Sequence, residues 1–173
     1  MHLAAAPIPR IEPHRQTLAA LPAGAAGVRA TLKIMRAYVK RYKVHPALRG
    51  LAMRLVEGLP QKDHRGEVRL IHAYVRDRIR YVRDVLEVET LQTPLATVEL
   101  GQGDCDDKAA LVATLLESIG FRSRFVAIGQ RAGKFSHVYA EVRMGTAWIA
   151  LETTEFWPVG RRPPGIAIKM IQE

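Results

Sequence analysis

The chain is 173 residues long, carries a formal net charge of +9 and has a single cysteine. This length suits one domain, or one domain with an extension, and it is enough to bury a core. One cysteine excludes an intramolecular disulfide framework, and no apolar run approaches the roughly 20 residues that span a bilayer. The first residues also lack the basic and apolar regions of a signal peptide, so we expect a cytoplasmic protein without a membrane partner.

All of the excess positive charge lies in the first third of the chain. Residues 1–62 hold 11 Lys and Arg against two acids, whereas residues 63–173 hold 15 against 15. Residues 1–26 are rich in Ala and Pro without an apolar period, which predicts a flexible or extended arm. Residues 27–62 are predicted to form a basic helical extension. Residues 1–62 together could bind nucleic acid or acidic protein surfaces, and the alternative is an ordinary solvated helix face.

Three helices are predicted before the cysteine. Apolar residues recur at helical spacing over residues 28–43. Pro46 is suited to the first turn of a second helix, which should end by Gly58. A third helix, with an apolar stripe, is predicted over residues 67–83.

The cysteine follows a long connection and a glycine-rich loop. Residues 84–104 lack a clear period, and we expect residues 90–94 to cross the surface near the cysteine. Cys105 then stands at the start of a helix, with Asp104 as the predicted N-cap and Asp107 completing a capping box. Unpaired N–H groups at such a helix start favour the thiolate, which predicts a lowered pKa for the Cys105 thiol.

Three strands are predicted after the cysteine helix, over residues 124–128, 136–143 and 147–152. Helices followed by antiparallel strands predict an α+β fold, with the cysteine-bearing helix packed on an antiparallel sheet. We expect this core to cover residues 63–173.

The hairpin between the last two strands predicts a contact between His137 and Glu152. If Met144 and Gly145 form a two-residue turn, these two residues stand directly opposite each other on one face of the sheet. A one-residue slip would place them on opposite faces.

One cysteine, one histidine and one acid, in that order, are the components of an activated sulfur nucleophile. Cys105 would attack a carbonyl carbon, His137 would transfer the proton, and Glu152 would orient the imidazole. The backbone N–H of Cys105 is a candidate oxyanion donor, and the side chain of Gln92 or Gln102 could supply a second.

Each of these residues has a simpler alternative when taken alone. A lone cysteine is often a small buried hydrophobe, a lone histidine an ordinary sheet residue, and a lone glutamate a solvated strand end. Asp106 and Asp107 could also bind a cation, but helix capping explains Asp107 better. The other histidines show no ligand spacing, so we expect neither a metal nor a cofactor.

Three segments together resemble the core of the transglutaminase-like superfamily, which has a papain-like α+β fold. They are Gly103 to Ala109, Ser136 to Val142 and Trp148 to Thr154. The resemblance covers about residues 65–157. It implies a catalytic triad in which Cys105 is the nucleophile, His137 the base and Glu152 the third member. The family usually has Asp in a Leu-Asp-Pro-Thr setting, whereas this chain has Leu-Glu-Thr-Thr.

A narrower resemblance, which includes the Gly-Asp-Cys-Asp-Asp run, is to transglutaminase-like cysteine peptidase proteins encoded by phages and prophages. It implies a cysteine-dependent amide hydrolase or acyl transferase that works through a thioester on a protein or peptide substrate. Phage structural proteins would then be possible partners, and the protein could be virion-associated. The alternative is an inactive assembly protein that binds DNA or acidic proteins through residues 1–62.

Overall fold

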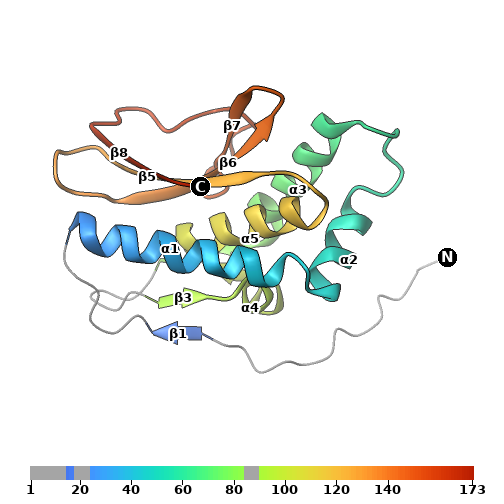
Figure 1. Ribbon diagram of the computed structural model, residues 1–173, viewed down its shortest axis with the longest axis horizontal. Helices are drawn as coiled ribbons and strands as arrows, with labels where there is room; N and C mark the ends of the chain where they lie inside the picture. The colour runs from blue at the N-terminus through green and yellow to red at the C-terminus, as the bar shows by residue number, and fades with distance from the viewer. Residues whose placement is uncertain (1–14, 18–23, 84–89) are drawn as a thin grey trace.

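A four-stranded antiparallel sheet lies on one side of a group of helices, and α5 (Cys105–Ser118) runs between the sheet and the other helices (Figure 1). The computed structural model describes residues 15–17, 24–83 and 90–173. The predicted α+β fold, with the cysteine-bearing helix packed on an antiparallel sheet, is confirmed.

Four further helices surround α5 in the part of the chain that the structure describes. They are α1 (Ala25–Tyr42), α2 (Pro46–Leu55), α3 (His64–Arg78) and α4 (Pro94–Leu100). The first two predicted helices are confirmed, and Pro46 does occupy the first turn of α2, where its missing N–H costs no bond. None of the described helices is long and apolar enough to cross a membrane.

α5 is buried on nearly every side. Of its 14 residues 11 are buried, and they include the small residues Ala109, Ala110 and Ala113. A helix enclosed by protein needs small or apolar residues all round rather than along one stripe. This enclosure fixes the position of its first residue, Cys105, relative to the sheet.

α1 and α2 share one hydrophobic core with α5 and the sheet. Five of their side chains are at most 1% exposed: Leu32, Met35, Val39, Leu48 and Ala52. The predicted extension over residues 27–62 therefore packs on the predicted core. Whether the two act as separate units stays a prediction.

Most of the predicted arm, residues 1–14 and 18–23, lies outside the described residues. Within it, β1 (Arg15–Thr17) pairs antiparallel with β3 (Thr90–Gln92). The arm is thus joined to the body at this one described strand.

The main sheet has the strand order β7-β6-β5-β8, with every pair antiparallel. Its strands are β5 (Ser123–Gly129), β6 (His137–Met144), β7 (Ala147–Leu151) and β8 (Ile168–Gln172). The three predicted strands are confirmed to within one residue at each end. β8 was not predicted, because it pairs with a strand some forty residues earlier and follows a proline-rich segment.

The third predicted helix ends earlier than its apolar stripe suggests. α3 stops at Arg78, and β2 (Arg80–Tyr81) then pairs in parallel with β4 (Gln102–Gly103). The N–H of Val82 donates to the carbonyl of Gly103, so the chain leaves the helical path and Val82 is exposed. The end of α3 is therefore set by a long-range pairing that periodicity does not reveal.

The predicted long connection also contains more structure than expected. After residues 84–89, which lie outside the described residues, come β3, α4 and β4. Thr93 caps α4 with its side chain, and Gly101 ends the helix in the left-handed conformation, with φ 63°. Leu91 to Pro94 are buried, so the expectation that this segment crosses the surface is wrong.

Candidate active site

Cys105 is the first residue of α5, and the capping box that the sequence predicts is present there. The carboxylate of Asp104 accepts the N–H groups of Asp106 at 2.9 Å and Asp107 at 3.0 Å. In return the carboxylate of Asp107 accepts the N–H of Asp104 at 3.3 Å. Within the described residues the N–H of Cys105 has no such acceptor, so it is available as a donor.

His137 and Glu152 are in direct contact at the end of the sheet where β6 begins. His137 opens β6, Glu152 follows the last residue of β7, and 2.5 Å separates Nε2 of the imidazole from Oε2 of the carboxylate. The other carboxylate oxygen accepts the N–H of Thr154 at 2.8 Å and its hydroxyl at 2.7 Å. Burial opposes ionisation of Glu152, but His137 and Thr154 together hold the pKa of this carboxyl below its ordinary value.

The predicted register of this hairpin is wrong by two residues. The turn is formed by Gly145 and Thr146 rather than by Met144 and Gly145. Gly145 has φ 60°, which glycine adopts without strain, and a glycine in first position is typical of a type II′ turn. A shift of two keeps side-chain alternation, so His137 and Glu152 still reach each other diagonally.

The sulfur of Cys105 lies beside the start of β6. The backbone N–H of Val138, the residue after His137, donates to it. The thiol itself donates to Asp106 at 3.4 Å, and among the described residues no hydrogen bond joins it to His137. Since Glu152 occupies Nε2 of the imidazole, Nδ1 is the nitrogen that remains for the thiol.

The expectation of a lowered thiol pKa is wrong for this structure. Burial raises the pKa of Cys105 well above its ordinary value, and the carboxylates of Asp106 and Asp104 raise it further. The N–H of Val138 opposes this only in part. The thiol is therefore held neutral, and forming a thiolate requires transfer of its proton to a base.

Lys108, one turn after the cysteine, is a site residue that the sequence analysis did not identify. Lys108 is 1% exposed, and its ammonium donates to the carbonyls of Ile79 at 2.5 Å and Arg76 at 3.3 Å. Burial lowers its pKa to about 8, although Glu152 and Asp77 oppose the shift. A lysine three residues after the cysteine, on a helix with apolar residues all round, was the available signal.

His72 is the second site residue that was missed. It is 1% exposed on α3, and its Nε2 lies 2.6 Å from the backbone carbonyl of Glu152. Burial lowers the pKa of this imidazole, while its bond to that carbonyl acts in the opposite direction. His72 stands next to Ile71 in the apolar stripe of α3, which already indicated an inward position.

The two candidate oxyanion glutamines differ in what they contact. The buried Gln92 donates its backbone N–H to Asp107 at 2.7 Å and its side-chain amide at 2.8 Å. That amide is thus committed to a neighbouring carboxylate. Gln102 is half-buried and accepts from Arg80 at 2.6 Å through its carbonyl oxygen, which leaves the second oxyanion donor a prediction.

Asp104, Cys105 and Asp106 place one possible metal-binding atom each within 4.8 Å of one another. Asp104 already accepts two helix N–H groups, and Asp106 accepts from the thiol. The alternative cation site at Asp106 and Asp107 is also opposed, because capping and Gln92 occupy Asp107. We assign no metal to these residues.

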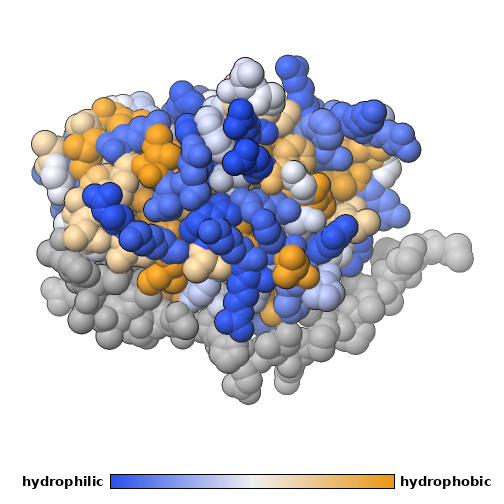
Figure 2. Space-filling model, viewed as in Figure 1, coloured by the Kyte–Doolittle hydropathy of each residue, from blue (hydrophilic) through white to orange (hydrophobic). Residues whose placement is uncertain are grey.

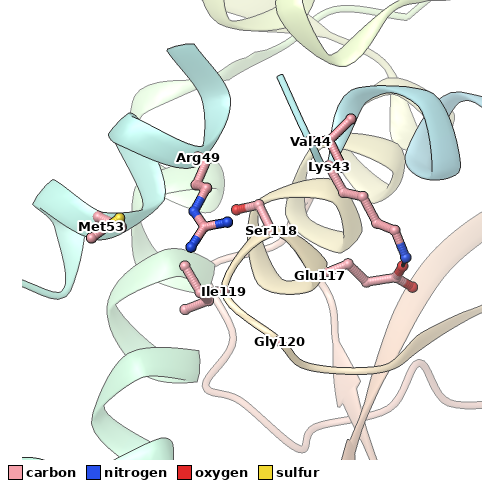
Figure 3. A pocket seen from close by; sticks show the side chains of 8 residues that line it. All are labelled: Lys43, Val44, Arg49, Met53, Glu117, Ser118, Ile119 and Gly120. Carbon is pink, nitrogen blue, oxygen red and sulfur yellow. Dashed lines mark hydrogen bonds and ion pairs between the residues drawn. The ribbon is translucent and has the colours of Figure 1, made fainter. Parts of the chain in front are cut away.

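A hollow at the other end of α5 offers no comparable chemistry (Figure 3). Among its described lining residues the only carboxylate is Glu117, which is paired with Lys43 beside it in the hollow and with Arg36. The hollow is about 20 Å from Cys105, the length of a helix of 14 residues. The candidate active site is therefore at the start of α5.

Comparison with known proteins agrees with this fold. Residues 50–153, more than half of the chain, match the family model of the transglutaminase-like superfamily. A candidate cysteine protease from Cytophaga hutchinsonii is 18% identical, with a TM-score of 0.54 over 80% of this chain and 50% of that structure. A candidate protease from Parabacteroides distasonis is 12% identical, with a TM-score of 0.56 over 75% of this chain and 26% of that structure.

This chain therefore spans half or less of each of these structures, and the likeness concerns the fold. No curated protein matches the chain.

Proposed function

The chain belongs to the transglutaminase-like superfamily, and on this premise we propose that it is a cysteine-dependent amide hydrolase or acyl transferase. The observation that carries the proposal is the hydrogen-bonded pair of His137 and Glu152 beside the helix start that bears Cys105. The substrate is an amide in a protein or peptide.

The reaction begins from a neutral thiol. The sulfur of Cys105 attacks the amide carbonyl carbon while Nδ1 of His137 takes the thiol proton. The developing oxyanion accepts a hydrogen bond from the free N–H of Cys105 at the start of α5. His137 then protonates the departing amine, and a thioester remains on the enzyme. Attack by water, or by a second amine, cleaves the thioester and returns the proton to the sulfur.

Glu152 has the role of holding His137 for this transfer. Its carboxylate accepts a hydrogen bond from Nε2–H of His137, which fixes the tautomer in which Nδ1 is free to act as a base. The carboxylate also stabilises the imidazolium formed after proton transfer. Its own position is fixed by Thr154 and by the contact of its backbone with His72.

Formation of an acyl-enzyme tests the proposal. The wild-type protein is incubated with an N-acetylated peptide p-nitrophenyl ester and analysed by intact mass spectrometry. We expect one acyl group on Cys105, none on Cys105→Ala, and acylation about 10²–10⁴-fold slower for His137→Ala. His64→Ala is the control, because this exposed histidine contacts Glu67 instead. Equal acylation of Cys105→Ala would refute the proposal.

A second candidate function, binding of a polyanion, is favoured by the surface of α1. This helix contains no acidic residue, and Arg29, Lys33 and Lys40 are exposed on it. Figure 2 shows hydrophilic residues gathered over the face where α1 lies. Such a surface would suit nucleic acid, and a role in phage assembly is the biological setting that the sequence resemblance suggests.

Anisotropy of a fluorescent DNA duplex tests this second candidate. Its affinity should fall steeply with salt, because bound phosphates release counterions. The triple substitution of Arg29, Lys33 and Lys40 by Gln should abolish binding, and the same number of changes on α3 should not. Binding unaffected by the triple substitution would exclude α1 as the contact surface.

A further inference from the structure

A groove of about 790 Å³ lies between α3 and the edge strand β7, outside the catalytic contacts described above. One wall is a stripe of α3 that includes Arg65, Arg69 and His72, and the other comes from β7 and the segment that follows it. We refer to it as the α3–β7 groove. Its volume lies within the range of sites that bind small molecules or peptide side chains.

The groove is cationic at its rim. Arg65 and Arg69 are exposed, and neither has a carboxylate partner among the described residues. A third lining arginine, Arg76, is paired with Asp77 and also donates to the carbonyl of Trp157. None of the described lining residues is acidic. The groove therefore presents two unpaired guanidinium groups to an anionic ligand.

The floor of the groove is apolar. It is lined on the helix side by Val68 and Ala73, and on the sheet side by Met144, Ile149 and Val159. Of these five only Val68 is fully buried, so the others keep part of their surface open to a ligand. Unpaired cations above apolar surface fit a ligand that carries both carboxylates and apolar groups.

The groove leads from the far end of the molecule towards the catalytic residues. His64, next to Arg65, contacts Phe121 just beyond the end of α5, whereas Arg76 contacts Lys108 in its first turn. The 11 steps along α3 from Arg65 to Arg76 span about 16 Å of helix, which an extended peptide of about five residues covers. At the near end, His72 lines the groove and contacts the backbone of Glu152.

We propose that the α3–β7 groove binds an acidic and apolar segment of the protein substrate, at a distance from the amide that reacts. The identification of the ligand as substrate rests on the proposed function, whereas the binding chemistry does not. Carboxylates of the segment pair with Arg65 and Arg69, and its apolar side chains cover Ile149 and its neighbours. The groove thereby supplies affinity for the substrate that the residues around Cys105 do not.

Peptide binding to the Cys105→Ala protein tests the inference without interference from catalysis. The probe is a fluorescein-labelled peptide of alternating aspartate and leucine, followed by anisotropy at low salt. We expect saturable binding that is at least about tenfold weaker in the Arg65→Gln, Arg69→Gln double variant. Ala147→Trp, at an exposed lining residue, should fill the groove and weaken binding without removing a charge.

Matched controls separate the groove from general electrostatic attraction. Arg29→Gln with Lys33→Gln removes the same charge from α1 and should leave the affinity unchanged. Peptides of alternating aspartate and serine, or lysine and leucine, should bind at least about tenfold more weakly. Absence of saturable binding, or equal losses in the α1 and groove variants, would overturn the inference.

Peptide binding and acylation together distinguish failure of this inference from failure of the proposed function. Binding in the expected pattern, with no acylation of Cys105 in the wild type, would leave the groove as a docking site on an inactive protein. Normal acylation of Cys105 without peptide binding would reject the groove as a substrate-binding site and would leave the proposed enzymatic function standing.

Discussion

The position of Glu152, the proposed partner of His137, is set by several residues that contact it. Each of its carboxylate oxygens has a partner, His137 on one and Thr154 on the other, and its backbone carbonyl contacts His72. The family's usual aspartate is one methylene shorter. Here the longer side chain reaches the imidazole diagonally across the β6–β7 pair, because Leu151 faces Ala140 and Glu152 follows it.

Glu152→Gln should keep the fold but slow acylation by about 10²–10⁴-fold. The amide has the shape of the carboxylate but cannot stabilise an imidazolium or enforce the same tautomer. Glu152→Asp should retain more activity than Glu152→Gln, since it keeps the charge. The measurement is the acylation rate of each variant, with circular dichroism to confirm folding. Equal rates for Glu152→Gln and the wild type would show that Glu152 is not the third member.

The same contacts predict a pH dependence. The pKa of Glu152 is held below its ordinary value in the fold, so its stabilising contribution is present above the unfolded pKa and is lost as the pH falls through the folded one. The unfolding free energies of the wild type and Glu152→Gln, measured in urea, should therefore converge at low pH. A difference in unfolding free energy that stays constant down to pH 2 would contradict this.

The thiol offers a further test at residue scale. Burial comes first and the charge of Asp106 second in raising the pKa of Cys105, so Asp106→Asn should lower that pKa. When the rate of iodoacetamide labelling of the wild type is plotted against pH, its midpoint should lie above the pKa of a free thiol, about 8.5. The midpoint of Asp106→Asn should lie at a lower pH than that of the wild type. Asp77→Asn is the control. A wild-type midpoint below that of free cysteine would show that the thiol is activated at rest.

At the scale of elements, local signals located α1, α2, α3, α5 and the strands β5 to β7, whereas long-range pairings set the end of α3 and formed β8. The capping box at Asp104 could be predicted because it depends on residues three apart. The end of α3 could not, since it depends on pairing with Gln102 and Gly103, some twenty residues later. The α4 helix was missed although Thr93 and Pro94 are ordinary start signals, because its seven residues show no apolar period. The prediction of a lowered pKa for the Cys105 thiol was wrong because the burial that raises this pKa is a property of the folded chain.

Lys108 connects two of these elements, and its removal should loosen the junction of α3 and α5. Lys108→Met leaves the carbonyls of Ile79 and Arg76 without this donor, which should cost about 1–3 kcal/mol of unfolding free energy at pH 7. The pKa of Lys108 is about 8 in the fold, below its ordinary value, so the folded state binds fewer protons than the unfolded state between these two values.

Wild-type stability should therefore rise, relative to Lys108→Met, as the pH increases from 8 towards 10.5, by at most roughly 3 kcal/mol. Urea unfolding of both proteins at pH 7.5 and pH 10 measures the difference in stability. Both proteins contain Cys105, so the contribution of its titration cancels in this difference. A gap that narrows at high pH would contradict the lowered pKa.

On the scale of the whole molecule, the region that matches the family model is smaller than the unit that folds. The match begins at residue 50, inside α2, and omits α1 entirely. Yet α1 covers one side of α5, and the buried Arg36 reaches from it to Glu117 at the far end of that helix, in contact through NH2 and Oε1 at 2.5 Å. The charged extension inferred from composition is thus also a structural part of the body.

A truncated chain that begins at residue 50 should consequently fail to fold cooperatively. Leu32, Met35 and Val39 are each at most 1% exposed, and fully burying one such side chain contributes about 1.5–3 kcal/mol. Their sum, roughly 5–9 kcal/mol, is comparable to the 5–15 kcal/mol by which native proteins are stable. Urea unfolding followed by circular dichroism should give a sigmoidal transition for the full chain and none for residues 50–173. The Arg29→Gln, Lys33→Gln variant is the control and should preserve the transition, because both side chains are exposed on α1. If residues 50–173 instead unfold cooperatively with unchanged stability, the fold does not need α1, and α1 is an independent extension of the region that matches the family model.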